Sequence, residues 1–289
     1  MESAVTGVIA GRAAALAVAM VLAIAGLAPV ATSAQPIAVV TDLQGKATLQ
    51  SAAGSKAASI TTTLQAGDRV ALEPDTRLSV LFYATGAGFD ARGPGEVSVG
   101  AGALTGTARV EPRSTAPGRE LKLRTGPLVQ GAVVLRALGL RLPASGGTIL
   151  ERSPEFQWTD TAEGATYELT LTDAADNVLH RVQTRARSQH LPPEMVLAEG
   201  AEYRLEIVAV GGGRLTQRAS SKFTVASAEL RQQVHGLAPS VDAPVADRVA
   251  YALWLEDNGL NDEARKWWAG IAEARPGEAA ASRRAAPPR

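Results

Sequence analysis

The hydrophobic pattern of this chain changes its period once, and that change constrains the fold more than any other feature. Between residues 36 and 227 the apolar residues form short runs that alternate with polar residues, and glycine-containing turns separate the runs. A period of two residues is typical of strands with one buried face. From residue 244 to 276 the apolar residues recur with the period of a helix. We therefore expect a mainly β protein that ends in one α-helical hairpin.

The first 34 residues have the order of segments that a secretory signal peptide shows. A short region with Arg12 precedes an uncharged apolar stretch at 13–30, and small residues follow at 31–34. This order favours cleavage after Ala34 and predicts a periplasmic protein. The alternative is an uncleaved inner-membrane anchor, because a stretch of this length can just span a bilayer. In either case we expect membrane contact only through this segment.

Charge and composition argue against several classes of function. The chain carries 29 basic and 29 acidic residues, so its net charge gives no reason to expect nucleic acid as a partner. Cysteine is absent, which removes disulfides, thiol nucleophiles and cysteine-ligated metals. The composition therefore fits an exported binding protein better than a nucleic-acid-binding or thiol-dependent one.

Residues 35–138 are expected to form one β-rich domain. Short alternating runs are separated by turn residues such as Gly45, Gly67 and Pro74, and no segment has ten or more residues of helical period. The runs predict strands at 37–41, 47–49, 69–72, 78–83, 95–99, 104–110, 120–123 and 132–137. An all-β meander or roll follows from this pattern.

Three short motifs in this domain have a familiar spacing. Val39-Val40 is followed after four residues by Gly45-Lys46-Ala47, then by Leu64 and Gly67-Asp68-Arg69-Val70, and then by the apolar run 78–82. Over about residues 36–113 the chain thus resembles the periplasmic domain of the FecR family. The turn at 84–89 departs from that family, and the twelve residues before the apolar leader cannot hold its cytoplasmic anti-sigma segment. The resemblance therefore implies the extracytoplasmic fold and not sigma-factor regulation.

Residues 139–227 are expected to form an immunoglobulin-like β-sandwich. Alternating runs predict strands at 154–158, 166–172, 178–184, 203–210 and 217–225. The motifs Pro154-x-Phe156-x-Trp158 and Tyr167-x-Leu169-x-Leu171 resemble those of fibronectin type III or related bacterial immunoglobulin-like domains. Trp158 alternates with Phe156, which favours a core position between the sheets; the alternative is a ring that stacks on a sugar.

Residues 244–276 are expected to form a helical hairpin, with a linker at 228–243 before it and a disordered tail at 277–289 after it. Ala252, Gly259, Ala264, Trp268 and Pro276 have the spacing of a single tetratricopeptide unit, which the hairpin resembles. One such unit cannot bury both of its faces alone. The hairpin must therefore pack on another part of the chain or on another protein.

Five large side chains of the hairpin are candidates for partner binding. They are apolar or aromatic, and an exposed patch of this kind is a liability in a soluble protein. We expect either that they cover the β domains of the same chain, or that they form a docking groove for another chain. These residues are Tyr251, Trp254, Leu255, Trp267 and Trp268.

No catalytic constellation is visible in the sequence. His180, His190 and His235 are far apart and lie outside any zinc-binding or nucleophile motif, and no phosphate-binding glycine loop precedes a helix. We therefore predict no enzymatic activity, no cofactor and no metal. The predicted function is an exported scaffold of the bacterial cell envelope that binds a protein partner. The alternative is a peptidoglycan- or polysaccharide-binding module.

Overall fold

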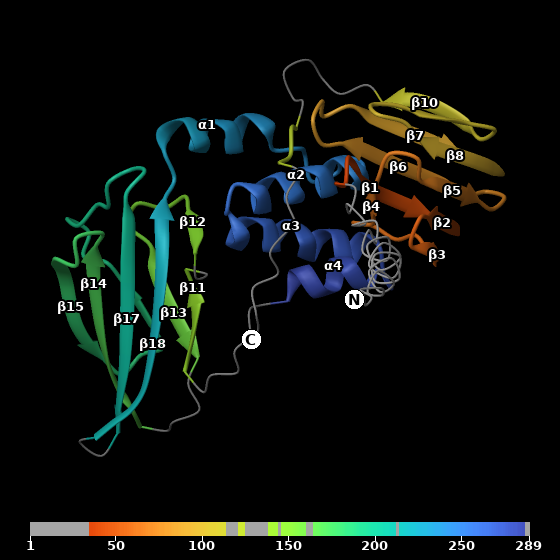
Figure 1. Cartoon of the computed structure of the whole chain (residues 1–289). Coiled ribbons are helices and arrows are strands. Elements are labelled where there is room, and N and C mark those ends of the chain that lie inside the picture. Colours follow the sequence, from red (N-terminus) through yellow and green to blue (C-terminus); the bar gives the residue numbers. More distant parts are fainter. Residues whose placement is uncertain are drawn as a thin grey trace, which may run out of the picture. The chain divides into compact units, whose positions relative to one another are not determined.

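The computed structural model of the chain describes residues 35–113, 121–124, 138–143, 146–159, 164–211 and 214–286 (Figure 1). The leader at 1–34 and the strand expected at 132–137 lie outside the described residues. The described part contains strands β1 to β18 followed by helices α1 to α4. The fold is mainly β with C-terminal helices, which confirms the predicted fold class.

The N-terminal domain consists of two five-stranded antiparallel sheets. The first sheet has the order β10 (Arg109–Arg113), β7 (Gly88–Arg92), β6 (Arg77–Phe82), β1 (Ala38–Gln44) and β4 (Thr63–Leu64). The second sheet has the order β3 (Gly54–Ala57), β2 (Ala47–Ser51), β5 (Arg69–Leu72), β8 (Gly95–Val99) and β9 (Leu104–Gly106). The two sheets occupy the red, orange and yellow part of the chain in Figure 1.

Alternation along the strands gives the first sheet two different faces. Its inner face packs against the second sheet in one apolar core, to which the first sheet contributes Ala38, Val40, Leu78, Val80 and Ala91. Residues one position away along the strands point to the opposite, outer face. Of these, Val39 and Leu81 belong to a different core, which they share with the helices.

The N-terminal domain differs from the sequence prediction in several places, and strands β3, β4 and β7 form where no strand was predicted. The expected strand at 104–110 is split, because the chain leaves the second sheet after β9 and enters the first sheet with β10. Gly106 makes this crossing possible, since its φ is +152° and a Cβ there would lie 2.0 Å from the Glu96 carbonyl oxygen. The expected strand at 120–123 is not formed in its described residues, where Leu123 N–H donates one hydrogen bond to the Tyr83 carbonyl at 3.1 Å.

The second β domain is a sandwich of a three-stranded and a five-stranded sheet. The smaller sheet has the order β11 (Gly139–Leu142), β13 (Glu155–Thr159) and β16 (Ser188–His190). The larger sheet has the order β12 (Gly147–Ile149), β18 (Arg214–Val225), β17 (Glu202–Gly211), β14 (Thr166–Asp173) and β15 (Val178–Thr184). Trp158 is 2% exposed and meets Tyr167 edge-on with a centroid distance of 5.3 Å, as expected for a core residue.

Four helices follow the sandwich, where the sequence predicts two. α2 (Val245–Asp257) and α3 (Asn261–Ala274) form the expected hairpin. α1 (Ala228–Leu237) occupies part of the expected linker, and the Ser227 hydroxyl caps it by accepting a hydrogen bond from Leu230 N–H. α4 (Ala279–Ala285) occupies part of the expected disordered tail, because Ala280 and Ala281 are buried. None of the described helices combines the length and the apolar character needed to cross a membrane.

The helices pack mainly on the N-terminal domain, and the sandwich meets them through Leu150 and through a hydrogen bond from Thr148 N–H to the Gly259 carbonyl at 2.7 Å. Their apolar side chains share one core with Val39, Ile60, Leu81 and Tyr83 of that domain. The sandwich has a separate core made only of residues between 138 and 225. The part of the outer face that carries Val39 and Leu81 is therefore covered by helices that lie about two hundred residues later in the sequence.

Candidate functional site

The five predicted partner-binding residues lie inside the core shared by the helices and the first sheet. Tyr251, Trp254, Leu255 and Trp268 are at most 6% exposed, and Trp267 is half-buried. The Tyr251 ring stacks on the Trp254 ring with a centroid distance of 5.9 Å, and it meets the Trp267 ring edge-on with a centroid distance of 5.1 Å. This arrangement is the intramolecular alternative of the two that the sequence left open.

The polar groups of two of these rings, the Tyr251 hydroxyl and the Trp268 indole N–H, also donate hydrogen bonds within the protein. Tyr251 Oη donates to the Val234 carbonyl at 2.8 Å, and Trp268 Nε1 donates to Glu256 Oε1 at 2.8 Å. Burial, together with the nearby Glu263 carboxylate, raises the pKa of Tyr251 to about 12. Tyr251 and Trp268 are thus hydrogen-bonded inside the molecule, whereas Trp267 is half-buried and keeps part of its ring accessible.

Arg284 joins α4 to the aromatic core. Its guanidinium pairs with Glu256 and lies over the Trp268 ring, 5.2 Å from the centroid. Burial raises the pKa of Tyr83 to about 12, and the Arg284 charge acts in the opposite direction. The charge of Arg284 on α4 therefore acts on Tyr83, which lies directly after β6.

The turn between α3 and α4 is also held to the N-terminal domain by polar contacts. Arg275 donates to both carboxylate oxygens of Asp42, at 3.0 and 2.8 Å. Glu278 accepts a hydrogen bond from Ile60 N–H at 3.4 Å. A two-bond guanidinium–carboxylate pair fixes direction as well as distance. The helices are therefore docked in a defined position and do not merely cover apolar surface.

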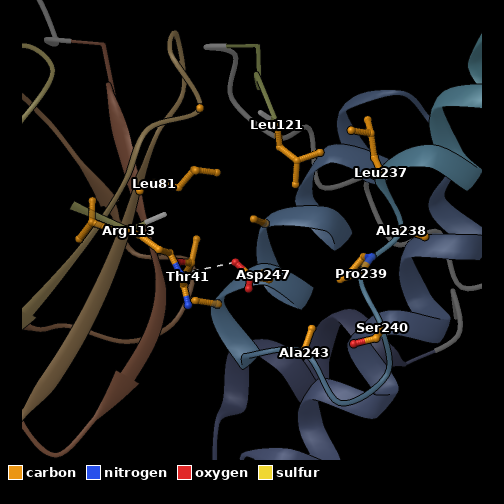
Figure 2. A pocket seen from close by; sticks show the side chains of 15 residues that line it. Thr41, Leu81, Arg113, Leu121, Leu237, Ala238, Pro239, Ser240, Ala243 and Asp247 are labelled. Atoms are coloured by element: carbon orange, nitrogen blue, oxygen red, sulfur yellow. Dashed lines mark ion pairs between the residues drawn. The ribbon is translucent and has the colours of Figure 1, made fainter. Parts of the chain in front are cut away.

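Beside these contacts lies a cleft of about 470 Å³ between the first sheet and the helices (Figure 2). One wall is made by strands β1, β6, β7 and β10 and carries Leu81, and Leu121 lies at the edge of the cleft. The other wall is made by the end of α1, the loop after it and the first turns of α2. Small or apolar residues line most of this second wall: Leu237, Ala238, Pro239, Ala243, Ala246 and Ala250.

One ion pair bridges the two walls of the cleft. Arg113 of β10 approaches Asp247 of α2 with an Nε–Oδ1 distance of 3.5 Å (Figure 2). Gly88 makes room for the arginine, because a Cβ at this position would lie 3.2 Å from two carbons of the Arg113 side chain. The cleft thus offers apolar walls with one pair of opposite charges, and such a mixture suits an apolar group with a polar end.

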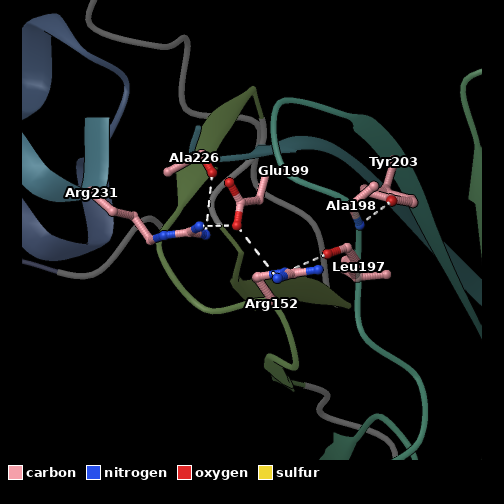
Figure 3. Close-up of polar contacts among 7 residues, drawn as sticks. All are labelled: Arg152, Leu197, Ala198, Glu199, Tyr203, Ala226 and Arg231. Carbon is pink, nitrogen blue, oxygen red and sulfur yellow. Dashed lines mark hydrogen bonds and ion pairs between the residues drawn. The ribbon is translucent and has the colours of Figure 1, made fainter. Parts of the chain in front are cut away.

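A second polar junction links the sandwich to α1 (Figure 3). The Glu199 carboxylate pairs with both Arg152 and Arg231. Arg152 Nε also donates to the Leu197 carbonyl at 2.9 Å, and Arg231 donates to the Ala226 carbonyl at 3.4 Å. Glu199 therefore fixes the start of α1 to a loop of the sandwich.

The described residues show no grouping of side chains suited to a metal ion. No three histidine, aspartate or glutamate side chains of the described part converge as ligands. His190 Nε2 lies 3.4 Å from Glu155 Oε1; His190 is exposed and Glu155 is half-buried. The sequence pattern predicted the aromatic hairpin as a candidate site but gave no indication of the cleft. The residues that line the cleft come from seven separate segments of the chain.

Comparisons with known proteins leave the family of this chain open. No protein-family model and no curated protein match it. Its resemblance to the FecR family and to a tetratricopeptide unit therefore stays a prediction.

Weak likenesses to solved structures involve fibronectin type III domains. A two-domain fibronectin type III segment of chicken tenascin is 13% identical, with 67% of this chain and 95% of that chain covered and a TM-score of 0.25. The FN1–FN3 domains of chicken CNTN1 are 11% identical, with 66% of each chain covered and a TM-score of 0.22. A β-1,2-glucanase from Parabacteroides distasonis is 8% identical, with 83% of this chain and 39% of that chain covered and a TM-score of 0.22. The sandwich of this chain is defined by the pairing of its own strands.

Proposed function

We propose that this chain is an exported, non-enzymatic scaffold of the bacterial cell envelope, and that its cleft binds an apolar segment of a protein partner. The observation that carries this proposal is the cleft between the first sheet and the helices, with its apolar walls and the bridging pair Arg113–Asp247. Its volume of about 470 Å³ lies within the range of clefts that bind ligands.

The lining of the cleft favours apolar side chains as the group that is bound. Ala243, Ala246 and Ala250 present only methyl groups, and Gly86 and Gly88 present no side chain at all. Such positions leave space that a partner's larger side chains can fill, with gain of buried apolar area. The Arg113–Asp247 pair supplies polar groups for the backbone or charged end of the same segment.

The envelope location is supported by the leader. Its charged start, apolar stretch and small-residue end have the order of a cleavable signal peptide. An uncleaved anchor would place the same domains on the same side of the inner membrane.

The glycan-binding alternative has less support. It depended on aromatic rings of the β domains that could stack on sugars. Phe156, Trp158 and Tyr167 are each at most 2% exposed, so these rings offer no stacking surface.

A pair of tryptophan substitutions tests the proposal. Ala243→Trp fills the cleft, because Ala243 lines it and is half-buried. Val241→Trp is the matched control, because Val241 lies two residues away, is 78% exposed and does not line the cleft. Each variant and the unchanged protein are used as bait in envelope extract, and the captured proteins are identified by mass spectrometry.

We expect the unchanged protein and Val241→Trp to capture the same protein from the extract, and Ala243→Trp to capture none of it. Thermal unfolding shows whether both variants are folded. Capture that is equal in all three baits would contradict a binding role for the cleft. Sedimentation of all three with purified peptidoglycan, without a captured protein, would favour the glycan-binding alternative.

A further inference from the structure

Three arginines lie side by side on the outer face of the first sheet. Arg77 of β6 is the direct cross-strand partner of Arg92 of β7, and Arg92 is the direct partner of Arg109 of β10. All three are exposed. Alternation places them on the same face as Leu81 but at the opposite end of the strands, away from the helix core. We call these three residues the arginine row.

Nothing in the described part of the fold requires this arrangement. Like charges at directly opposite positions of an antiparallel sheet are destabilising. Arg109 is held by Glu111, with an Nε–Oε1 distance of 2.8 Å. Within the described residues no ion pair joins Arg77 or Arg92 to a carboxylate. The arginine row is therefore a concentration of positive charge that the described residues only partly neutralise.

The neighbouring row of the same face carries carboxylates. Asp42, Ser79, Asp90 and Glu111 follow one another across strands β1, β6, β7 and β10, two residues along each strand from the arginine row. Two residues of strand correspond to about 6.6–6.8 Å. Asp42 is bound by Arg275, and Asp90 accepts a hydrogen bond from the Ser79 hydroxyl at 2.6 Å. A broad anionic surface such as a bilayer would press negative charge against these carboxylates, whereas a narrow anion along the arginine row would avoid them.

The distance between neighbouring arginines of the row indicates how closely spaced the charges of a matching ligand must be. Neighbouring strands are about 4.7–4.9 Å apart, so the backbone positions of the three arginines span roughly 10 Å. A condensed phosphate chain carries at least one negative charge within each strand spacing of this size. An extended acidic peptide presents side chains on one face only every 6.6–6.8 Å or so, which fits the row less well. Guanidinium groups also match phosphate oxygens through paired hydrogen bonds.

We propose that Arg77, Arg92 and Arg109 form a binding site for a linear polyanion that carries phosphate groups and lies across strands β6, β7 and β10. The site shares no residue with the cleft, so it is independent of the function proposed for the cleft. The ligand runs perpendicular to the strands, and the three guanidinium groups contact phosphate groups along its length.

Calorimetric titration with inorganic tripolyphosphate tests this site. The double variant Arg77→Gln/Arg92→Gln removes two charges of the arginine row. The control variant Arg69→Gln/Arg218→Gln removes the same charge elsewhere, because Arg69 is on the second sheet and Arg218 on the sandwich, and both side chains are 62% exposed. We expect the first variant to lose affinity about tenfold or more, since two charge-assisted contacts are removed, and the control to match the unchanged protein.

Several outcomes would overturn the proposal. An equal loss in both double variants would mean that net charge alone attracts the phosphate, and no loss in either would place binding elsewhere. Orthophosphate that binds as tightly as tripolyphosphate would exclude a linear ligand. Loss of binding to phosphatidylglycerol vesicles in Arg77→Gln/Arg92→Gln, with tripolyphosphate affinity unchanged, would assign the row to a membrane surface. The melting temperature of Arg77→Gln/Arg92→Gln should not fall, because the substitution relieves repulsion between like charges.

Discussion

The two β domains of this chain bury their sheets in different ways. The sandwich packs its two sheets on each other, and its core contains only residues between 138 and 225. The N-terminal domain also packs two sheets on each other, but its first sheet buries a second apolar face under the helices. One domain is therefore continuous in sequence, whereas the other is assembled from both ends of the described chain.

This difference shows what the C-terminal helices contribute. A single helical hairpin cannot bury both of its faces, and here it does not have to, because the outer face of the first sheet supplies the missing layer. The helices are thus a structural part of the N-terminal domain, and the cleft exists only because sheet and helices meet there.

Truncation after Ser240 should separate the two β domains more strongly than any single substitution. It removes α2, α3 and α4 and uncovers Val39, Leu81 and Tyr83. Each buried apolar side chain contributes about 1.5–3 kcal/mol. Whole domains are stable by only about 5–15 kcal/mol, so the N-terminal domain should lose its cooperative unfolding. The sandwich should stay folded.

Two-dimensional NMR of the truncated chain separates the two domains. Dispersed amide signals should remain for the sandwich and collapse for the N-terminal domain. Full dispersion of both sets would show that the two-sheet core is sufficient and that the helices are an accessory layer.

Substitution of one buried tryptophan in each core should destabilise one β domain and leave the other unchanged. Trp268→Ala removes a ring from the core shared by helices and sheet, and Trp158→Ala removes one from the sandwich core. Each should cost about 3–5 kcal/mol of unfolding free energy, but in different domains. Chemical denaturation followed by domain-specific NMR signals measures this. A single transition that shifts equally for both variants would mean that the two domains unfold as one unit.

Alkaline pH should affect the helix-covered domain and have no effect near neutrality. Burial raises the pKa of Tyr83 and of Tyr251 to about 12, from 10 in the unfolded chain. The native state then binds more protons than the unfolded state between pH 10 and about 12, so its stability falls as the pH rises through that window. Thermal unfolding at pH 8, 10 and 11 measures the loss. Phenylalanine substitution at both tyrosines should abolish this dependence.

Local patterns were sufficient for much of the fold. The alternation of Tyr167, Leu169 and Leu171 predicts a strand with one buried face, and all three side chains are buried in β14. The helical period of 244–276 predicts α2 and α3 to within a few residues. The sequence prediction places a linker where α1 forms, although Ser227 is a preferred N-cap residue and Glu229 is an acidic residue in the first turn.

Both candidate sites depend on contacts that no local pattern contains. Arg77, Arg92 and Arg109 are 15 and 17 residues apart, and only the register of β6, β7 and β10 brings them side by side. Arg113 and Asp247 likewise meet across the cleft only because the helices return to the first sheet. The neutral net charge of the chain gives no sign of either arrangement.

The pairing of Asp42 with Arg275, 233 residues later, has a consequence for the order of events during biosynthesis. A chain is synthesised from its N-terminus, and contacts of high sequence separation form late. The sandwich can fold as soon as residue 225 is available, while the older N-terminal domain still waits for its last layer. The earliest part of the described chain is thus the last to mature, and its uncovered sheet is the surface that a chaperone would have to protect in the interval.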